Sequence, residues 1–282
     1  MTRKEIFNRT LAIAGSLYDP HEAAAIADRL CADLFGFGRF EVAMDGEKKP
    51  QEFDKALFDN ALERLSSGEP VQYIVGHTEF YGRRFKVCPG VLIPRPETEE
   101  LVAWVLDECG AREGCRVLDI GTGSGAIAIS LAAERSDWSV DALELSPVAA
   151  DVAEENARAN NVRVNLLRGD VFEFAPSAES YDVIVSNPPY IPLTEREEME
   201  RNVRDFEPHE ALFVPLERPL LFYERIADVA QVALRSGGWL CFEIHSPLSG
   251  QTAKMLREKG FCSLMLRNDI NSKPRMIICR KS

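Results

Sequence analysis

The stretch Val117-Leu118-Asp119-Ile120-Gly121-Thr122-Gly123-Ser124-Gly125-Ala126 decides how this chain folds. Its apolar start predicts a buried strand over residues 116–120, and its spaced glycines predict a tight turn into a helix over residues 126–133. A strand, a glycine turn and a helix in this order form the first unit of a parallel α/β sheet. Glycines let a ligand approach the backbone, and the start of the helix supplies N–H donors. The stretch therefore predicts a ligand site as well as a fold.

Strands and helices alternate through the sequence that follows. We predict strands over residues 139–143, 164–167, 181–185, 239–244 and 276–279, and helices over residues 147–160, 220–234 and 251–259. Alternation with short links is typical of a mostly parallel sheet wrapped by helices. Residues 93–282 are therefore predicted to form an α/β, Rossmann-like domain, which begins with an extended segment and a helix from Pro96.

The first quarter of the chain has a different, helical pattern. Three apolar stripes at helical spacing predict a small bundle over residues 1–70, and we expect their members to be its core: Phe7, Leu11, Ala14 and Leu17; Ile26, Leu30 and Leu34; Phe53, Leu57, Ala61 and Leu65. Residues 71–92 are rich in β-formers and glycine, at Tyr73-Ile74-Val75, Phe80-Tyr81 and Phe85-Lys86-Val87. They predict a β-hairpin linker between the two domains.

Composition narrows the class of protein. The 282 residues are 45% hydrophobic, which supports a substantial core. A net charge of −12 argues against non-specific nucleic-acid binding, which requires clustered Lys and Arg. The seven cysteines and four histidines have no zinc spacing, so no metal is predicted. No apolar signal or membrane segment is visible, and we expect a soluble cytoplasmic protein.

Glu144 follows the predicted strand 139–143 and bears on the ligand of the glycine turn. A carboxylate at this place can accept hydrogen bonds from both hydroxyls of a ribose. Gly121-x-Gly123-x-x-Ala126 also satisfies the dinucleotide fingerprint, so this stretch alone leaves an NAD-dependent enzyme open.

Asn187-Pro188-Pro189-Tyr190 follows the predicted strand 181–185 and carries the most specific chemistry. It offers a side-chain amide, two residues without an N–H, outward carbonyls and an aromatic face. This set suits a planar –NH2 group held by its hydrogens while the nitrogen stays free to react. A hydride-transfer enzyme has no use for such a loop, which disfavours an NAD-dependent reaction.

The glycine turn, the acidic residue after the second strand and Asn-Pro-Pro-Tyr after the fourth together resemble S-adenosylmethionine-dependent class I methyltransferases that act on nitrogen. Further stretches resemble the protein-(glutamine-N5) methyltransferases of peptide-chain release factors: Leu92–Glu99, Leu118–Ala128, Ser186–Tyr190, Glu207-Pro208 with Ala211-Leu212, and Gly237-Gly238. The likeness runs from about Pro70 to Arg275, and the N-terminal bundle matches only as a helical domain of the expected size.

The resemblance implies a role for each site residue. S-adenosylmethionine would lie against Gly121, Thr122, Gly123, Ser124 and Gly125, with Glu144 on its ribose and Asp170 and Val171 at its adenine. Asn187 would contact both cofactor and substrate, and Pro188, Pro189 and Tyr190 would hold the glutamine of a Gly-Gly-Gln motif in class 1 release factors. Catalysis would rest on Asn187, Pro188 and Tyr190, and the helical domain would recognise the protein substrate.

Some positions depart from the family pattern, and other functions remain open. Glu144 stands where Asp is more frequent, Val171 where a larger residue often meets adenine, and His245 where Gly is usual; residues 213–219, with Val214-Pro215, replace a glycine-containing stretch.

The alternative functions are glutamine methylation of a ribosomal protein, N6-adenine methylation of a flipped base, and a non-catalytic binding module. The acidic net charge disfavours the nucleic-acid alternative.

Overall fold

The computed structural model describes residues 1–110 and 112–282, which form two compact units. The first unit comprises Met1–His77 and Glu200–Phe206, and the second comprises Thr78–Met199 and Glu207–Ser282. The chain therefore returns to the first unit once, shortly after Asn-Pro-Pro-Tyr. These boundaries differ from the predicted ranges 1–70, 71–92 and 93–282, whose division into recognition domain, linker and methyltransferase domain stays a prediction.

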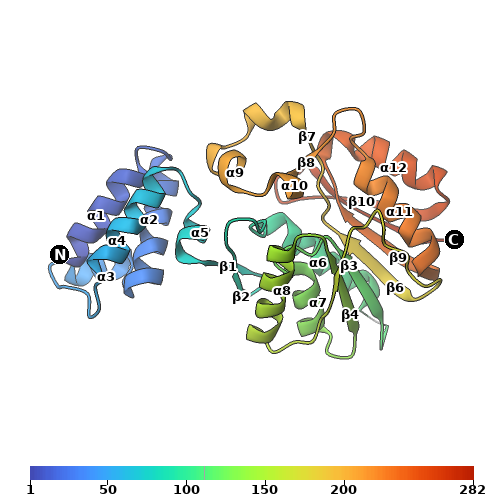
Figure 1. Ribbon diagram of the computed structural model, residues 1–282, viewed down its shortest axis with the longest axis horizontal. Helices are drawn as coiled ribbons and strands as arrows, with labels where there is room; N and C mark the ends of the chain where they lie inside the picture. The colour runs from blue at the N-terminus through green and yellow to red at the C-terminus, as the bar shows by residue number, and fades with distance from the viewer. Residues whose placement is uncertain (111) are drawn as a thin grey trace. The chain divides into compact units, whose positions relative to one another are not determined.

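The first unit is helical, as predicted, but it holds more helices than the three expected. Figure 1 shows α1 (Arg3–Ala14), α2 (Pro20–Phe35), α3 (Arg39–Asp45), α4 (Lys55–Ser66), α5 (Val71–Val75) and α9 (Arg201–Phe206). Side chains cap the main helices: Thr2, Asp19 and Asp54 each accept hydrogen bonds from backbone N–H groups of the first turn. Pro20 follows the Asp19 cap at the start of α2, where a proline loses no hydrogen bond within the helix.

Two members of the predicted apolar stripes do not lie in this core. Leu17 is exposed beyond the end of α1 at Ala14, and Leu57 is exposed on α4, outside the buried face of that helix. The buried face of α4 therefore consists of Phe58, Ala61, Leu62 and Leu65. Phe58 packs against Phe35 and Phe53, with ring centroids 5.7 Å apart in both pairs.

The predicted β-character of Tyr73-Ile74-Val75 is wrong, since these residues belong to the single-turn helix α5. Arg64 explains the difference: its guanidinium donates to the carbonyl oxygens of Tyr73 at 3.0 Å and Ile74 at 3.4 Å. Glu69 holds the same guanidinium through an ion pair of 2.6 Å. Carbonyls at a helix end have no partner within the helix, so a tertiary contact here stabilises a turn that local propensity disfavours.

The second unit contains a seven-stranded sheet in the order β10-β11-β9-β6-β3-β4-β5. Its strands are β3 (Arg116–Ile120), β4 (Ser139–Glu144), β5 (Asn165–Arg168), β6 (Tyr181–Ser186), β9 (Leu234–Glu243), β10 (Phe261–Asn268) and β11 (Pro274–Lys281). Strands β9, β6, β3, β4 and β5 pair in parallel, whereas β11 and β10 pair antiparallel at one side. The predicted mostly parallel sheet is confirmed, and β10 is a strand that the sequence pattern did not predict.

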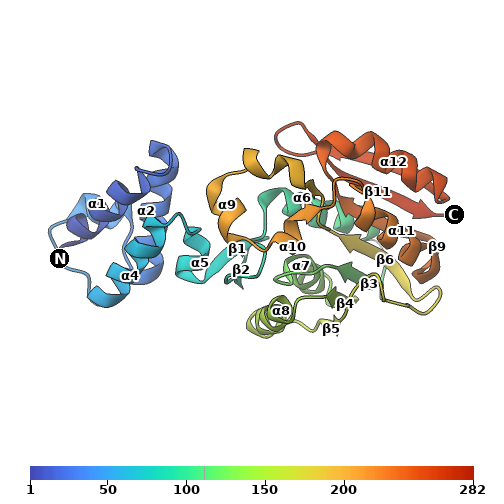
Figure 2. The same ribbon diagram turned by 45° about the horizontal axis from the view of Figure 1, so that its top comes forward.

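Helices cover both faces of this sheet (Figures 1 and 2). One face packs on α6 (Pro96–Cys109), α7 (Ala126–Glu134) and α8 (Pro147–Ala159); the other packs on α11 (Leu221–Ala233) and α12 (Ser249–Glu258). Successive strand residues alternate between the two cores, as Val183 and Ile184 do in β6. Both neighbours are fully buried, so the central strands read as unbroken apolar runs.

A hairpin and several short elements complete the second unit. The hairpin of β1 (His77–Phe80) and β2 (Arg83–Lys86) is confirmed, and Phe80 and Phe85 join the core beneath α6. Between β6 and α11 lie the short elements β7 (Ile191–Pro192), η1 (Leu193–Glu198), α10 (His209–Leu212) and β8 (Phe213–Val214), and η2 (Ser246–Leu248) follows β9. Among the described residues, no helix has the length and apolar character that a membrane span requires.

Candidate active site

The predicted site residues meet at one edge of the sheet because they follow adjacent parallel strands. β3 leads into the glycine loop, β4 ends at Glu144, β5 is followed by Asp170, and β6 is followed by Asn187. Parallel strands bring their carboxyl ends to the same edge, where open α/β sheets bind ligands. The structure therefore brings together the two loops that the sequence analysis singled out.

The glycine loop is shaped by backbone geometry. Gly121, Gly123 and Gly125 have φ angles of 73°, 58° and 84°, which favour glycine. A Cβ built on Gly121 or Gly123 would meet no atom within 4 Å, whereas one on Gly125 would lie 2.7 Å from Ile129 Cδ1. The first two glycines thus border open space, and the third permits close packing of α7.

Glu144 is hydrogen-bonded to this loop. One carboxylate oxygen accepts the Gly123 N–H at 2.8 Å, and the other accepts the Ser146 N–H at 2.8 Å. Burial raises the pKa of Glu144, and these backbone hydrogen bonds oppose the shift. Each oxygen retains acceptor capacity, so the carboxylate can also accept a pair of neighbouring hydroxyls.

Asp119 is a candidate that the sequence analysis missed. It lies fully buried in β3, where Oδ2 accepts the Thr122 hydroxyl at 2.6 Å and the Ala128 N–H at 3.2 Å. Its Oδ1 has no hydrogen-bond partner in residues 1–110 and 112–282. Burial raises the pKa of this carboxyl to about 7. The available signal was an acidic residue inside an apolar strand, directly before the glycines.

The residues predicted to flank adenine occupy different environments. Asp170 is partly exposed and accepts the Phe172 N–H at 2.9 Å. Val171 points into the core beneath α11, and its carbonyl accepts the Arg225 Nε–H at 2.8 Å. The neighbouring apolar side chains that are exposed are Leu145 and Phe172, and neither was singled out from the sequence.

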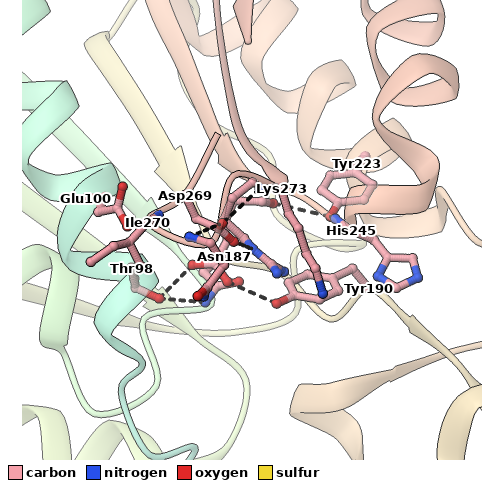
Figure 3. A network of polar contacts seen from close by, with 12 residues as sticks. Thr98, Glu100, Asn187, Tyr190, Tyr223, His245, Asp269, Ile270 and Lys273 are labelled. Carbon is pink, nitrogen blue, oxygen red and sulfur yellow. Dashed lines mark hydrogen bonds and ion pairs between the residues drawn. The ribbon is translucent and has the colours of Figure 1, made fainter. Parts of the chain in front are cut away.

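The Asn-Pro-Pro-Tyr loop is held by side chains from distant parts of the chain (Figure 3). Asn187 Nδ2 donates to Thr98 Oγ1 at 3.3 Å, and the Tyr190 hydroxyl donates to Glu243 Oε1 at 3.0 Å. Thr98 also donates its hydroxyl to Glu243 Oε2 at 2.6 Å. Sequence reasoning missed Glu243, although it is an acidic residue at the end of an apolar strand, as Glu144 is.

His245 supports the same loop from the other side of Tyr190. The two rings are stacked, with centroids 5.7 Å apart and planes 23° apart. His245 Nε2 lies 3.0 Å from Glu195 Oε1, in η1. The departure from the usual glycine therefore introduces two contacts to the segment that contains and follows Asn-Pro-Pro-Tyr.

Two further stretches quoted for the resemblance lie in contact with each other. Arg95 forms an ion pair of 2.6 Å with Glu207, and Glu207 also accepts the Ile93 N–H at 3.2 Å. Glu207 is buried, so this carboxylate joins the extended segment before α6 to the segment before α10.

Comparisons with known families match both parts of the chain. Residues 99–203 match the methyltransferase small domain, and residues 12–76 match the PrmC N-terminal domain. A release factor glutamine methyltransferase from Bacteroides thetaiotaomicron is 41% identical over 94% of this chain and 95% of its own. Proteins of the same name from Flavobacterium psychrophilum and Streptococcus pneumoniae are 36% and 45% identical, over 93% and 74% of this chain and 93% and 73% of theirs.

Solved structures share the fold at lower identity. A methyltransferase from Pyrococcus furiosus is 19% identical with a TM-score of 0.54, covering 79% of this chain and 99% of its own. The catalytic domain of hMettl16, in complex with an RNA hairpin, is 20% identical with a TM-score of 0.57, covering 72% of this chain and 77% of its own. These likenesses support the methyltransferase fold alone.

Proposed function

This chain belongs to the release factor glutamine methyltransferase family, and we propose that it methylates the glutamine of the Gly-Gly-Gln motif in class 1 peptide-chain release factors. The methyl group comes from S-adenosylmethionine and is transferred to the N5 amide nitrogen of that glutamine. Release factors act at the ribosome, so the proposed place of the reaction is the cytoplasm.

The residues at the sheet edge fit the cofactor. Gly121 and Gly123 border open space, and Glu144 retains acceptor capacity for ribose hydroxyls. Asp119 leaves one carboxylate oxygen without a partner among the described residues, beneath the loop. A buried negative charge of this kind favours a cationic ligand nearby. Leu145 and Phe172 add exposed apolar surface for adenine beside the proposed Asp170 and Val171.

The chain's own residues would act mainly by position and polarity. When S-adenosylmethionine is bound, its sulfonium makes the methyl carbon electrophilic. Asn187 Oδ1 and the Pro188 carbonyl oxygen each accept one N–H of the glutamine amide, which fixes the nitrogen and stabilises the positive charge that develops on it. Tyr190 covers the flat face of the amide, and the prolines bring no competing N–H donor.

The proton balance requires no strong base. The amide nitrogen forms a bond to the methyl carbon as the sulfur–carbon bond breaks. The alkylated nitrogen is more acidic than the starting amide and then loses one proton to water. Catalysis on this scheme is positioning, which can contribute roughly 7–11 kcal/mol in favourable cases.

The single observation that carries this proposal is the placement of Asn187. Asn187 directly follows β6, the sheet neighbour of β3, so it leaves the same sheet edge as the glycine loop, and Oδ1 accepts no hydrogen bond from the described parts of the chain. A free amide oxygen beside a cofactor loop suits a substrate –NH2 group.

One labelling experiment tests the function. The protein is incubated with isotopically labelled S-adenosylmethionine, a class 1 release factor, ribosomal proteins and DNA, and the label is located by mass spectrometry. We expect label on the Gly-Gly-Gln glutamine, and none on a release factor whose glutamine is replaced. Label on a ribosomal protein or on adenine, with none on release factor, would replace this proposal by one of the alternatives.

We further propose that the helical unit recognises the release factor. The side chains of Phe40 and Met44, one turn apart on α3, are 70% and 71% exposed. Deletion of residues 1–70 is a poor test because Glu200–Phe206 packs with this unit. Phe40→Ser with Met44→Ser is sharper: KM for intact release factor should rise while KM for a short Gly-Gly-Gln peptide stays unchanged. An equal change for both substrates would refute this role.

A further inference from the structure

Glu243 is a buried carboxylate with no place in the reaction described above. It is the last residue of β9 and is 1% exposed. Both of its oxygens are used as acceptors: Oε2 accepts from Thr98 at 2.6 Å, and Oε1 accepts from Tyr190 at 3.0 Å. Thr98 and Tyr190 in turn contact or flank Asn187 (Figure 3). Glu243 therefore lies one hydrogen bond from Tyr190 and two from Asn187, behind the residues proposed to hold the substrate.

The direction of these hydrogen bonds follows from what each group can do. An ionised carboxylate only accepts, so both hydroxyls must donate to Glu243. A threonine hydroxyl has one hydrogen, and Thr98 uses it at 2.6 Å on Glu243. Towards Asn187, Thr98 Oγ1 can then only accept. The group that Asn187 turns to Thr98 must be its –NH2, in agreement with the 3.3 Å contact of Nδ2.

The direction of the hydrogen bond from Asn187 to Thr98 determines which atom of the Asn187 amide faces the substrate. With Nδ2 held by Thr98, the remaining polar atom is Oδ1, which only accepts. In the reverse orientation Asn187 would present an –NH2 group, which cannot bind the N–H of a substrate amide. Asparagine orientation is otherwise weakly determined, since the two ends of an amide have nearly the same shape.

We propose that Glu243 is a positioning residue that, through Thr98, orients the Asn187 side chain so that Oδ1 faces the substrate –NH2 group. The same carboxylate fixes the Tyr190 hydroxyl. This inference rests on the proposed function, in which Asn187 Oδ1 accepts a substrate N–H. It adds a selection rule: the site binds hydrogen-bond donors, and a substrate group that offers only acceptors is rejected.

The relay requires Glu243 to be ionised, and burial and the neighbouring groups act on its pKa in opposite directions. Burial raises the pKa of Glu243 and outweighs the hydrogen bonds from Thr98 and Tyr190 and the charge of Arg275, which lower it; Glu97 adds to the rise. Arg275 is itself held by Asp269 at 3.0 Å. A neutral, protonated Glu243 could donate to Thr98 and release its hydroxyl, which would remove the constraint on Asn187.

Thr98→Val tests the relay because valine keeps the shape and removes the hydroxyl. We expect kcat to fall roughly 10- to 100-fold, with KM for S-adenosylmethionine unchanged, since only the substrate side loses its orientation. Thr98→Ser restores a hydroxyl and should recover most of the activity. Thr252→Val is the matched control: Thr252 is also buried, and its hydroxyl donates to the Leu248 carbonyl oxygen, so activity should stay as in the wild type.

A second measurement does not depend on catalysis. In protein labelled with ¹⁵N at asparagine side chains, the Asn187 –NH2 signal is assigned by its loss in Asn187→Asp. We expect that signal to shift in Thr98→Val and in Glu243→Gln, and to stay near its wild-type position in Thr98→Ser and Thr252→Val.

The two measurements separate failure of this inference from failure of the proposed function. If folded Thr98→Val keeps both wild-type kcat and the wild-type Asn187 signal, the relay is refuted. If the wild type fails to label release factor, the proposed function is refuted, and the amide signal alone then decides whether Glu243 and Thr98 orient Asn187.

Discussion

The glycine loop and the Asn-Pro-Pro-Tyr loop lie at the same sheet edge, and each has a buried carboxylate behind it, but the two carboxylates are used differently. Asp119, behind the glycine loop, leaves Oδ1 without a partner among the described residues. Glu243, behind the reactive loop, has both oxygens hydrogen-bonded. Asp119 leaves an acceptor oxygen open near the proposed cationic cofactor, whereas Glu243 sets the direction of a hydrogen-bond network. The positive φ angles of its glycines shape the glycine loop, whereas side-chain hydrogen bonds hold the Asn-Pro-Pro-Tyr loop.

The largest expected effect comes from breaking the reactive loop at its centre. Asn187→Ala should lower kcat by about 10²- to 10³-fold, because it removes an acceptor that strengthens as charge develops on the amide nitrogen. Binding of S-adenosylmethionine, measured by calorimetry, should weaken far less. If cofactor affinity collapsed while kcat at saturation held, Asn187 would belong with the glycine loop and the contrast between the two loops would be lost.

Breaking the glycine loop should give the opposite pattern. Glu144→Ala removes the carboxylate that binds Gly123 and Ser146 and is proposed to hold the ribose. The dissociation constant for S-adenosylmethionine should rise roughly 10- to 100-fold, the range for hydrogen bonds to a charged group. Turnover at saturating cofactor should change little. Glu144→Gln, which keeps one acceptor, should lie between; unaltered affinity in both variants would contradict the ribose assignment.

The buried carboxyl behind the glycine loop predicts a dependence of stability on pH. The folded-state pKa of Asp119 is about 7, above the ordinary value of about 3.9, so its contribution to stability is full at low pH and is lost as pH rises through 7. Asp119→Asn does not titrate. It should therefore raise Tm relative to wild type more at pH 8 than at pH 5.

Asp141→Asn is the matched control for that measurement, because both Asp141 oxygens have side-chain partners, Tyr181 and Asn165. It should lower Tm at both pH values. The same Tm difference for Asp119→Asn at pH 5 and pH 8 would show that Asp119 keeps one protonation state over this range. Saturating S-adenosylmethionine should reduce the benefit of Asp119→Asn, since a nearby cation stabilises the ionised carboxylate.

The smallest expected effect comes from removing the two contacts of the His245 ring, to Tyr190 and to Glu195. His245→Phe keeps the stack on Tyr190 and loses the contact to Glu195, while His245→Gln does the reverse. Each should lower kcat by about 2- to 10-fold, in the range of single aromatic contacts, without changing cofactor affinity. His245→Gly removes both contacts and should be additive if they are independent. A gain in kcat for His245→Gly would instead indicate that His245 restrains the loop.

The two loops also differ in how far the sequence predicted them. Glycine spacing between an apolar strand and a helix is a local pattern, and the positive φ angles of Gly121, Gly123 and Gly125 are its local cause. From residue 116 to residue 185 the predicted strand and helix limits are accordingly close to the observed ones, whereas β9 begins at Leu234 instead of residue 239 and β10 was not predicted. The β-character predicted for Tyr73-Ile74-Val75 was wrong because Arg64, which lies on the preceding helix α4, stabilises the carbonyls of α5.

The sequence by itself determined the glycine loop, the Asn-Pro-Pro-Tyr motif and the alternation of strands and helices, because each depends on residues that are near one another in the chain. The parallel sheet and its carboxyl-edge site then followed from the general rules for such alternation. Only the tertiary structure decided that Thr98, Glu243 and His245 surround that motif, that Asp119 is left with a free oxygen, and that Glu200–Phe206 packs with the helical unit. The physical reason is that a hydrogen bond or a stacked ring joins whichever residues the fold brings within contact distance. The distance between two residues in the sequence therefore does not predict which of these contacts form.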